Sequence, residues 1–469
     1  MKNNKKIMKN NMEKTGRTVS YSKRFKNGRS ISGSTAVICF AAVLLSAFLC
    51  CGCQNGPDVR NGEETEATVT ATEEEKTEAE SAAGADVPGA AEPSDPDAEN
   101  ETEQTEQTAV GGEEPEIRLS FLGAGDNIIY EGNINDARRC AAEGEEYDFA
   151  HVYDPIADRI GNADLAFINQ ETLMCGEGFD LSFYPCFNSP QEVGDTLVGL
   201  GFDVVNMANN HMLDRGAPGL GATIEYWKSQ PVLMLGGCES YQDYQNVRVW
   251  HGDGIDVAFL SYTYGTNGNV LPASSSLWVP YLFEADIPGD VAKARELADL
   301  VFISVHWGIE NSFVPSDEQR SYAQIMADSG ADVIIGHHPH VIQPIEWIEG
   351  KNGNRTLCIY SLGNLMAMMA EDYNLVGGLV SFDMVKPASG NAYVENVSFL
   401  PTLFNYPSTF RGLQVMPLSG CSEQIASSLG LSYYGNSTTK DRLFDFVSST
   451  IGGEFLSEDF LAAAAGPEE

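Results

Sequence analysis

From residue 117 onward, short apolar runs alternate with longer stretches that have helical periodicity. The runs are rich in β-branched and aromatic residues, as buried strands are, and each is followed directly by polar residues. We find six of them, at residues 117–122, 165–168, 204–205, 300–305, 333–335 and 357–360. Strands that alternate with helices predict an α/β domain, which we place at residues 117–405.

The clearest helix is predicted from Asp317 to Ser329. Ser316 and Gln319 have the spacing of a capping box at its start, and Gly330 is a stop signal. Spacings of three and four define its predicted buried face, which consists of Tyr322, Ile325 and Met326.

After about Asn405 the pattern of strands with polar ends stops, so residues 406–469 are predicted to form a small C-terminal extension. A Pro-, Gly- and Ser-rich stretch is followed there by a helix from about Thr439 to Ile451. We assign the extension no chemistry. The apolar face of its helix consists of Leu443, Phe444, Val447 and Ile451.

Residues 1–53 have the order of a secretory signal. Ten basic residues and one acidic residue stand among the first 29, and an apolar stretch of fourteen residues follows at 36–49. That stretch is shorter than the roughly 18 residues that a membrane-spanning helix needs. The pattern therefore predicts export, with an uncleaved N-terminal anchor as the alternative to a cleaved signal.

The end of this segment, Gly52-Cys53, resembles the cleavage site of bacterial lipoproteins, in which the cysteine becomes the lipidated N-terminus. Cys50 stands where such sites usually have an aliphatic residue. We expect an extracytoplasmic protein that is held at the cell membrane, either by lipid on Cys53 or by the uncleaved anchor.

Residues 54–116 are rich in Glu, Thr, Ala, Ser and Pro and contain twenty acidic residues against Arg60 and Lys76. Such a segment cannot bury enough apolar surface to offset its ordering entropy, so we predict a disordered, extended tether. The whole chain has a formal net charge of −39. A nucleic-acid partner is disfavoured because no basic stripe is available to neutralise phosphates.

Six cysteines lie beyond the signal region, and none forms a Cys-x-x-Cys zinc pattern. Cys175 and Cys186 are eleven residues apart, which is compatible with a local disulfide in an exported chain. Cys358 lies in an apolar run and is predicted to be a buried core thiol.

The polar residues behind the apolar runs are candidates for one site, because ligands of open α/β sheets bind at the carboxyl ends of the strands. Taken singly, each has a simpler explanation. Asp126 could cap a turn, Glu171 could be a solvated loop acid, and His306 could be a core histidine. Three consecutive hydrogen-bonding side chains at residues 209–211 are harder to explain by packing. Together these residues offer oxygen and nitrogen ligands that suit Zn, Mn or Fe.

The segment Gly336–His340 holds three of the seven histidines in four consecutive positions directly behind an apolar run. A histidine cluster at a strand end indicates a metal site, and the alternative is a polar surface loop. Because Pro339 disfavours the helical region for the residue before it, we expect an extended His338 and a stiff pair of His338 and His340. His337 is expected beside the ligands or facing solvent.

These residues also carry a family resemblance. The motifs in chain order are Gly125-Asp126, Asn169-x-Glu171, Asn209-Asn210-His211-x-x-Asp214, His306-Trp307-Gly308, Gly336-x-His338-Pro339-His340 and Ser361-Leu362-Gly363-Asn364. The series, from about Ile117 to Asn364, resembles that of the CapA family. The family consists of membrane-associated proteins implicated in poly-γ-glutamate capsule synthesis, and its domain is similar to the calcineurin-like metallophosphoesterases.

The resemblance implies a four-layer α/β/β/α sandwich of metallophosphoesterase type. It implies that His211 acts as a general acid or transition-state donor and that Asp214 orients it. It also implies one or two divalent ions, of Mn, Zn or Fe, surrounded by six residues: Asp126, Glu171, Asn210, His306, His338 and His340.

The sequence departs from the wider phosphoesterase pattern at two places. Ile128 stands where that pattern has a histidine, and Glu171 lies in the place of its second acidic motif. One ligand is therefore absent and another is longer by a methylene group. Both departures change the ligand set on which the number of bound ions depends, and phosphoester hydrolysis depends on that number in turn.

We expect a metal-dependent hydrolase that makes or handles poly-γ-glutamate or a similar anionic polymer, or that cleaves a phosphoester substrate, with other capsule-synthesis proteins as partners. One alternative is a non-catalytic capsule assembly or export factor that binds polymer in the same crevice. The other is an extracellular phosphoesterase or nucleotidase.

Overall fold

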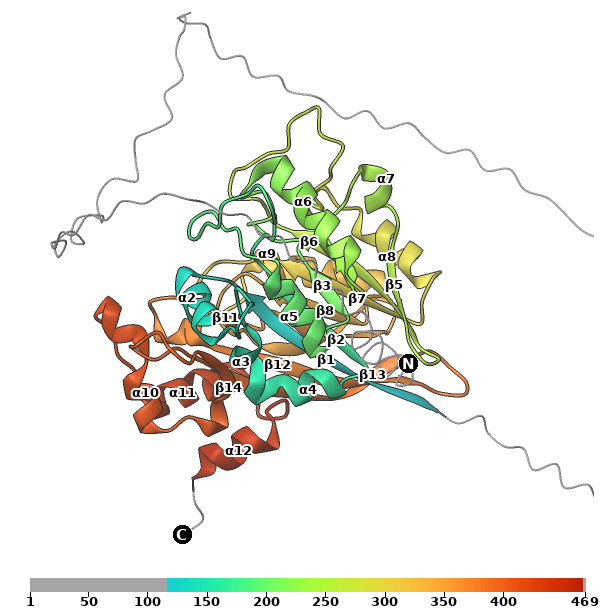
Figure 1. The fold of residues 1–469 in the computed structure, drawn as a ribbon. Helices are drawn as coiled ribbons and strands as arrows, with labels where there is room; N and C mark the ends of the chain where they lie inside the picture. The colour runs from blue at the N-terminus through green and yellow to red at the C-terminus, as the bar shows by residue number, and fades with distance from the viewer. Residues whose placement is uncertain (1–115, 467–469) are drawn as a thin grey trace, which may run out of the picture. The chain divides into compact units, whose positions relative to one another are not determined.

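The computed structural model describes residues 116–466, and the predicted signal or anchor at 1–53 and nearly all of the predicted tether lie outside them. The described chain is mixed α/β, as the sequence pattern predicts, and it contains two sheets, as the family resemblance implies (Figure 1). No helix among the described residues has the length and apolar character needed to cross a bilayer.

The first sheet has the strand order β14-β13-β12-β1-β2-β3-β4, with β11 paired to β1 off this path. Strands β1 to β4 and β11 run parallel, whereas β12, β13 and β14 are antiparallel. The bounds are β1 (Ile117–Asn127), β2 (Leu165–Gln170), β3 (Val204–Asn206), β4 (Leu233–Leu235), β11 (Asn364–Met366), β12 (Val376–Lys386), β13 (Tyr393–Asn405) and β14 (Gln414–Pro417).

The second sheet has the order β5-β6-β7-β8-β10-β9. Its four central strands are parallel, and the two edge strands are antiparallel to their neighbours. The bounds are β5 (Arg248–His251), β6 (Asp256–Thr263), β7 (Leu300–His306), β8 (Val333–His337), β9 (Ile345–Glu349) and β10 (Arg355–Ile359). All six strands predicted from the sequence are present, and the structure extends several of them into their polar ends.

The two sheets pack face to face through aromatic side chains. Phe121 of β1 stacks on Phe382 of β12 and meets Phe302 of β7 edge to face at 5.4 Å. Phe167 of β2 stacks on Phe259 of β6. Because side chains alternate along a strand, the neighbours of Phe302 in β7, Val301 and Ile303, point to the other face of the second sheet.

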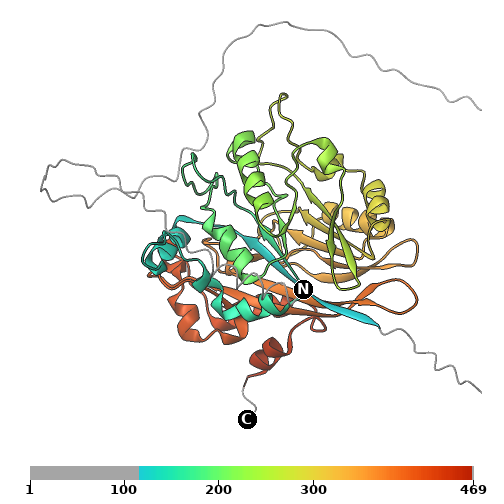
Figure 2. The ribbon, with the colours of Figure 1, turned by 45° about the vertical axis from the view of Figure 1, so that its right-hand side comes forward.

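That other face is covered by helices α8 and α9, which form a separate core with β6, β7, β8 and β10. Helices α4, α5 and α6 pack into the larger core that the first sheet shares (Figures 1 and 2). The helices are α2 (Glu131–Cys140), α3 (Ala150–Tyr153), α4 (Ala157–Asn162), α5 (Glu192–Leu200), α6 (Gly216–Ser229), α7 (Tyr241–Tyr244), α8 (Ile287–Arg295), α9 (Asp317–Ser329), α10 (Glu423–Ser428), α11 (Lys440–Thr450) and α12 (Glu458–Ala465).

Helix α9 has the predicted bounds, with a capping box between Ser316 and Gln319 and a left-handed Gly330 at its end. The predicted buried face is wrong at Ile325, which is 40% exposed. The stripe that faces the sheet instead runs through Gln319, Ala323 and Met326, since these residues follow one another at spacings of four and three.

The C-terminal part of the chain is tied to the first sheet rather than set apart from it. Strand β14 lies after Asn405 and pairs with β13, so the sheet continues past the point where the sequence pattern stops. Helix α11 is confirmed, and its buried face has the predicted residues Leu443, Phe444, Val447 and Ile451. Figure 1 shows α10 and α11 in red beside the β14 edge.

All six cysteines in the described part of the chain are free thiols, so Cys175 and Cys186, whose spacing is compatible with a local disulfide, are not bonded to each other. Cys175 is buried with its Sγ 3.6 Å from the Gly219 carbonyl oxygen of α6, while Cys186 is exposed. Cys358 is fully buried, as predicted.

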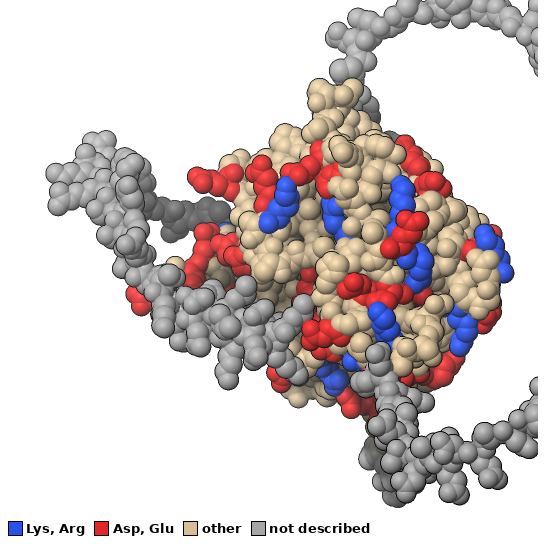
Figure 3. Space-filling model, turned by 90° about the vertical axis from the view of Figure 1, so that its right-hand side faces the viewer, with Lys and Arg blue, Asp and Glu red and all other residues tan. Residues whose placement is uncertain are grey.

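On the face shown in Figure 3, basic residues are interspersed among acidic ones and form no continuous basic surface on the described part that is visible there.

A first prediction concerns Gly336 in β8, immediately before the histidine segment. A Cβ atom at this position would lie 2.0 Å from the Tyr360 carbonyl oxygen and 2.7 Å from Trp307 Nε1. Trp307 Nε1 donates to that same carbonyl at 3.0 Å, so neither group can move freely. We expect Gly336→Ala to lower the free energy of unfolding by about 3 kcal/mol or more.

Denaturant unfolding of the full chain measures this change, and Gly199→Ala is the matched control. A Cβ at Gly199 in α5 meets no atom within 4 Å, so that variant should be neutral or slightly more stable. Equal stabilities of the two variants would contradict the prediction.

Candidate metal centre

Six polar strand ends from the two sheets meet at one edge of the molecule. Three belong to β1, β2 and β3 of the first sheet, and three follow β7, β8 and β10 of the second. Adjacent parallel strands place Asp126 opposite Asn169, and His306 opposite His337. The predicted residues are thereby brought together although they are up to 214 positions apart in the sequence, from Asp126 to His340.

Asp126 is fully buried and is held by several donors at the end of β1. Its Oδ1 accepts from Asn169 Nδ2 at 2.8 Å, and its Oδ2 accepts from the His338 backbone N–H at 3.2 Å. His337 Nδ1 lies 3.2 Å from Oδ1 and His340 Nδ1 lies 3.4 Å from Oδ2. Burial acts to raise the pKa of Asp126, but its contacts with His337 and His340 hold that pKa well below its usual value. Asp126 is therefore a carboxylate fixed in orientation.

Unlike Asp126, Glu171 is not held by hydrogen-bond donors from the described residues. It is 1% exposed, and neither Oε1 nor Oε2 has a hydrogen-bond partner among the described residues. Three ring nitrogens surround its Oε1: Nε2 of His306 at 3.7 Å, of His340 at 3.8 Å and of His211 at 4.0 Å. Burial, and then the charge of Asp126, raise the pKa of Glu171 well above its usual value. A buried carboxyl group without donors must either be protonated or be balanced by a cation.

His306 at the end of β7 is fully buried, and its Nε2 lies 2.9 Å from Asn210 Oδ1. This separation fits a hydrogen bond, and it is also close to the spacing of about 3 Å between neighbouring ligands of an octahedral ion with bonds near 2.1 Å. Burial, and then the nearby His338, keep the pKa of His306 well below its usual value, so the ring is neutral. A neutral imidazole is the form that ligates metals.

The His338-Pro339-His340 segment differs from the prediction. His338 has a φ of 97° and His340 a φ of 56°, so the expected extended conformation of His338 is wrong. Both residues occupy a region that costs non-glycine residues energy, and such strain concentrates at functional sites. It directs the His338 N–H at Asp126 and leaves the ring centroids of His338 and His340 5.7 Å apart.

The two rings have different protonation. Burial and the neighbouring His340 lower the pKa of His338 to about 3, and its Nδ1 has no hydrogen-bond partner among the described residues. For His340, burial acts to lower the pKa, but Glu171 and Asp126 raise it to about 9. His340 Nδ1 lies 3.0 Å from Asn364 Oδ1, which leaves its Nε2 directed toward Glu171.

His211 and Asp214 form a pair at the rim of the same crevice. His211 Nδ1 donates to Asp214 Oδ2 at 2.7 Å, and that oxygen also accepts from the Phe187 backbone N–H at 2.6 Å. The Phe187 ring packs edge to face on the imidazole at 4.8 Å. Because Nδ1 is engaged, His211 Nε2 is the atom that faces the crevice.

Sequence reasoning missed the roles of Asn364 and Glu310 and left two alternatives open for His337. His337 takes the first of them, beside the ligands, since it is fully buried and stacks on Phe167 next to Asp126. Asn364, quoted only as part of a motif, orients His340. Glu310 is exposed, and its carboxylate lies within 4.8 Å of ligand atoms of His338 and His340. An acidic residue four positions after His306 was the available signal for Glu310.

The residues fit a divalent cation. Asp126, Glu171 and His306 offer one ligand atom each within 4.8 Å of one another, and Glu310, His338 and His340 form a second such group. Buried atoms without partners among the described residues include both oxygens of Glu171, Nδ1 of His306 and Nδ1 of His338. Carboxylate and imidazole ligands suit zinc, manganese or iron.

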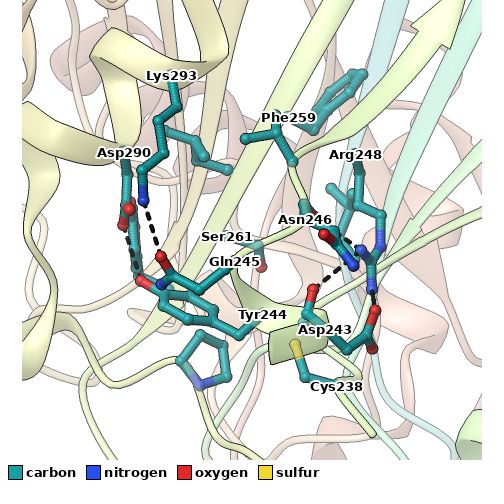
Figure 4. Close-up of a pocket in the computed structure, with 16 residues that line it drawn as sticks. Cys238, Asp243, Tyr244, Gln245, Asn246, Arg248, Phe259, Ser261, Asp290 and Lys293 are labelled. Carbon is teal, nitrogen blue, oxygen red and sulfur yellow. Dashed lines mark hydrogen bonds and ion pairs between the residues drawn. The ribbon is translucent and has the colours of Figure 1, made fainter. Parts of the chain in front are cut away.

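A second cavity lies between β6, α7 and α8 (Figure 4). Its lining gives no comparable indication of a bound metal ion. Its buried carboxylate, Asp290, accepts from Tyr244 at 2.8 Å and from Tyr262 at 3.0 Å. Lys293 donates to Gln245 at 2.8 Å, and Arg248 pairs with Asp243. Since each charged group of its lining already has a partner, we interpret this cavity as structural.

The fold and the site define a class: a two-sheet α/β protein with a buried histidine and carboxylate centre at the carboxyl ends of its strands. Residues 120–369 match the sequence profile of the bacterial capsule synthesis protein family, PGA_cap. The match covers more than half of the chain, and the chain belongs to this family.

Two relatives carry capsule names. The PGA biosynthesis protein CapA of Bacillus subtilis is 33% identical over 216 residues, which are 43% of this chain and 52% of that protein. The capsule biosynthesis protein CapA of Bacillus anthracis is 36% identical over 175 residues, 35% of this chain and 40% of that protein. The chain thus spans about half the length, or less, of these relatives.

Solved structures with a similar arrangement include the calcineurin-like phosphoesterase YfkN of Bacillus subtilis, with 13% identity, a TM-score of 0.36, and coverage of 71% of this chain and 97% of that one. A 5'-nucleotidase precursor of Thermus thermophilus gives 12% identity, a TM-score of 0.37, and coverage of 61% and 54%. At these scores the likeness carries no further argument.

Proposed function

We propose that this protein is a divalent-metal-dependent hydrolase with a four-layer fold of metallophosphoesterase type, acting on poly-γ-glutamate or a similar anionic extracellular polymer. The observation that carries the proposal is Glu171, a buried carboxylate that has no donor among the described residues and lies within 4.0 Å of three histidine rings. A purely structural carboxylate would be expected to have hydrogen-bond donors.

Asp126, Glu171 and His306 would hold one ion, and His338 and His340, with Glu310 at the rim, would hold or share a second. A bound divalent cation would supply Lewis-acid polarisation of the scissile group and would acidify water. The chain's own contribution is orientation: Asn169 and the His338 N–H fix Asp126, and Asn364 fixes His340.

His211 would move the proton. Its Nδ1–H is anchored on Asp214, so its Nε2 is free to donate a proton to a leaving group or to accept one. The backbone N–H of Phe187 on the same carboxylate oxygen keeps Asp214 in place. This arrangement supports acid–base chemistry on a phosphoester or an amide bond, and the substrate screen described below distinguishes the two.

We also propose that the protein is exported and held at the cell membrane, through lipid on Cys53 or through an uncleaved anchor. The support is the sequence of residues 1–53, and the acidic segment at 54–116 would act as the spacer. Mass spectrometry of the mature N-terminus tests the proposal, since a lipidated Cys53 would be the first residue.

The metal proposal is tested by elemental analysis of the purified full chain. We expect stoichiometric divalent metal, and we expect the double variant His338→Ala plus His340→Ala to retain substantially less. The control is His251→Ala, since His251 is an exposed residue that pairs with Asp256. Equal metal contents in the double variant and the wild type would overturn the proposal. A screen of phosphoesters, nucleotides and γ-glutamyl amides then assigns the reaction.

A further inference from the structure

A second group of ligand-type side chains lies at the end of α2, away from the six strand ends. It consists of Asp136, Cys140 and His151, each of which offers one atom within 4.8 Å of the others. Asp136 is 1% exposed, His151 is partly buried and Cys140 is exposed. None of the residues of the proposed hydrolytic centre belongs to this group.

The Asp136 carboxylate is a fixed acceptor. Its Oδ1 accepts from Arg139 at 2.9 Å and from the Gly412 backbone N–H at 3.1 Å, and its Oδ2 accepts from the Leu413 backbone N–H at 2.8 Å. A carboxylate has about four lone-pair positions, so one position on Oδ2 remains. His151 Nε2 lies opposite it at 3.0 Å.

The hydrogen-bond partner of His151 Nδ1 determines whether His151 Nε2 carries a hydrogen. Nδ1 is 3.0 Å from the Asp148 carbonyl oxygen, which can only accept, so Nδ1 carries a hydrogen. In a neutral ring, Nε2 would then be a bare lone pair facing the Asp136 Oδ2 lone pair and Cys140 Sγ at 3.6 Å. Two facing lone pairs, on Nε2 and Oδ2, require a cation between them at this distance, either a proton on Nε2 or a metal ion that also displaces the proton of the Cys140 thiol.

The distances are close to those around a tetrahedral metal ion. With bonds of about 2.0 Å to nitrogen and oxygen and 2.3 Å to sulfur, neighbouring ligands of a tetrahedral zinc ion are roughly 3.3 to 3.6 Å apart. The nitrogen–sulfur separation of 3.6 Å lies in this range, whereas the nitrogen–oxygen separation of 3.0 Å is shorter and would widen on metal binding. Donation of the remote His N–H to a backbone carbonyl is also the usual support of a metal-ligating histidine.

We propose that Asp136, Cys140 and His151 bind a zinc-like divalent cation, with water at the remaining position. The ion would join the end of α2 to residues 148–151, and through Asp136 to the segment at 411–413. This site is chemically distinct from the crevice, because it contains a cysteine sulfur and none of the crevice ligands does. The proposal does not depend on the hydrolase activity.

The cysteine sulfur gives a distinctive readout. Purified, metal-free full-length protein, in which Cys50, Cys51 and Cys53 are changed to serine so that they cannot bind the probe, is titrated with Co²⁺ and serves as the wild type of this experiment. The near-ultraviolet sulfur-to-cobalt charge-transfer absorption is recorded. We expect this absorption in the wild type, and we expect Zn²⁺ to abolish it by displacement. Cys140→Ser should remove it and lower the bound zinc by about one ion per chain. Co²⁺ in the crevice gives no such absorption, so failure of either proposal is recognised separately.

The matched control is Cys186→Ser, which changes the other exposed cysteine of the described chain and should leave the absorption intact. His151→Gln should weaken Co²⁺ binding at least tenfold, and circular dichroism before the titration establishes that each variant is folded. Absence of the absorption in the wild type would overturn the proposal and identify a proton on His151 as the cation. A sulfur-to-cobalt absorption that survives in Cys140→Ser would also overturn the proposal.

Discussion

Glu171→Gln is expected to reduce the affinity of the crevice for divalent metal by about 100-fold or more and, at the same time, to make the metal-free protein more stable. The loss follows because a carboxylate ligand is replaced by a neutral amide of the same shape. The gain follows because both oxygens of Glu171 are buried without hydrogen-bond donors among the described residues, a state that opposes folding when no cation is present.

We expect the metal-free Glu171→Gln variant to be about 1 to 3 kcal/mol more stable than the metal-free wild type near neutral pH. The sign follows from the raised pKa of Glu171, since a carboxyl whose pKa is higher in the folded state weakens folding as pH rises above its unfolded value. Thermal unfolding with and without added Mn²⁺ or Zn²⁺ measures both effects on one sample.

The matched control is Glu310→Gln. Glu310 also lies beside the crevice histidines, but it is exposed, so its substitution should leave the metal-free stability within about 0.5 kcal/mol of the wild type. A Glu171→Gln variant that binds metal as tightly as the wild type would remove the main support for the metal centre.

Substitution of the proton-transfer pair should separate catalysis from metal binding. We expect His211→Ala to lower kcat by about 10²- to 10⁴-fold with unchanged metal content, since His211 Nε2 faces the crevice 4.0 Å from Glu171. Asp214→Asn should give a smaller loss in the same direction. The amide no longer holds the Nδ1–H tautomer as the carboxylate does, although it preserves the shape of the side chain.

Turnover of the substrate found in the screen, measured together with metal content, tests this prediction. His251→Ala is a useful comparison, because that histidine is exposed, pairs with Asp256 and should leave kcat unchanged. Capsule output by cells that carry His211→Ala gives a second readout. Full output and unchanged turnover would contradict an enzymatic role and favour a factor that binds polymer without cleaving it.

The sequence by itself determined the elements and the types of side chain at the site. Six apolar runs became strands, and α9 begins and ends as its cap and glycine predict, because these signals are local along the chain. The identity of the site residues followed from polar side chains that recur directly after apolar runs. Strands β12 and β13 were not among the six predicted runs, although they end in the polar residues Lys386 and Asn405.

Only the tertiary structure decided how these residues meet. The sequence suggested one crevice, but the strand ends come from two stacked sheets, and stacking depends on contacts such as Phe121 with Phe302 that are remote along the chain. The positive φ of His338 is likewise imposed from outside the segment, by Asp126 accepting its N–H, and it overrides the local preference that Pro339 sets. The lack of hydrogen-bond donors to the Glu171 oxygens among the described residues is likewise decided by the tertiary structure. Whether a carboxylate has a donor is decided by everything that surrounds it in space, and the chain's order alone does not contain that information.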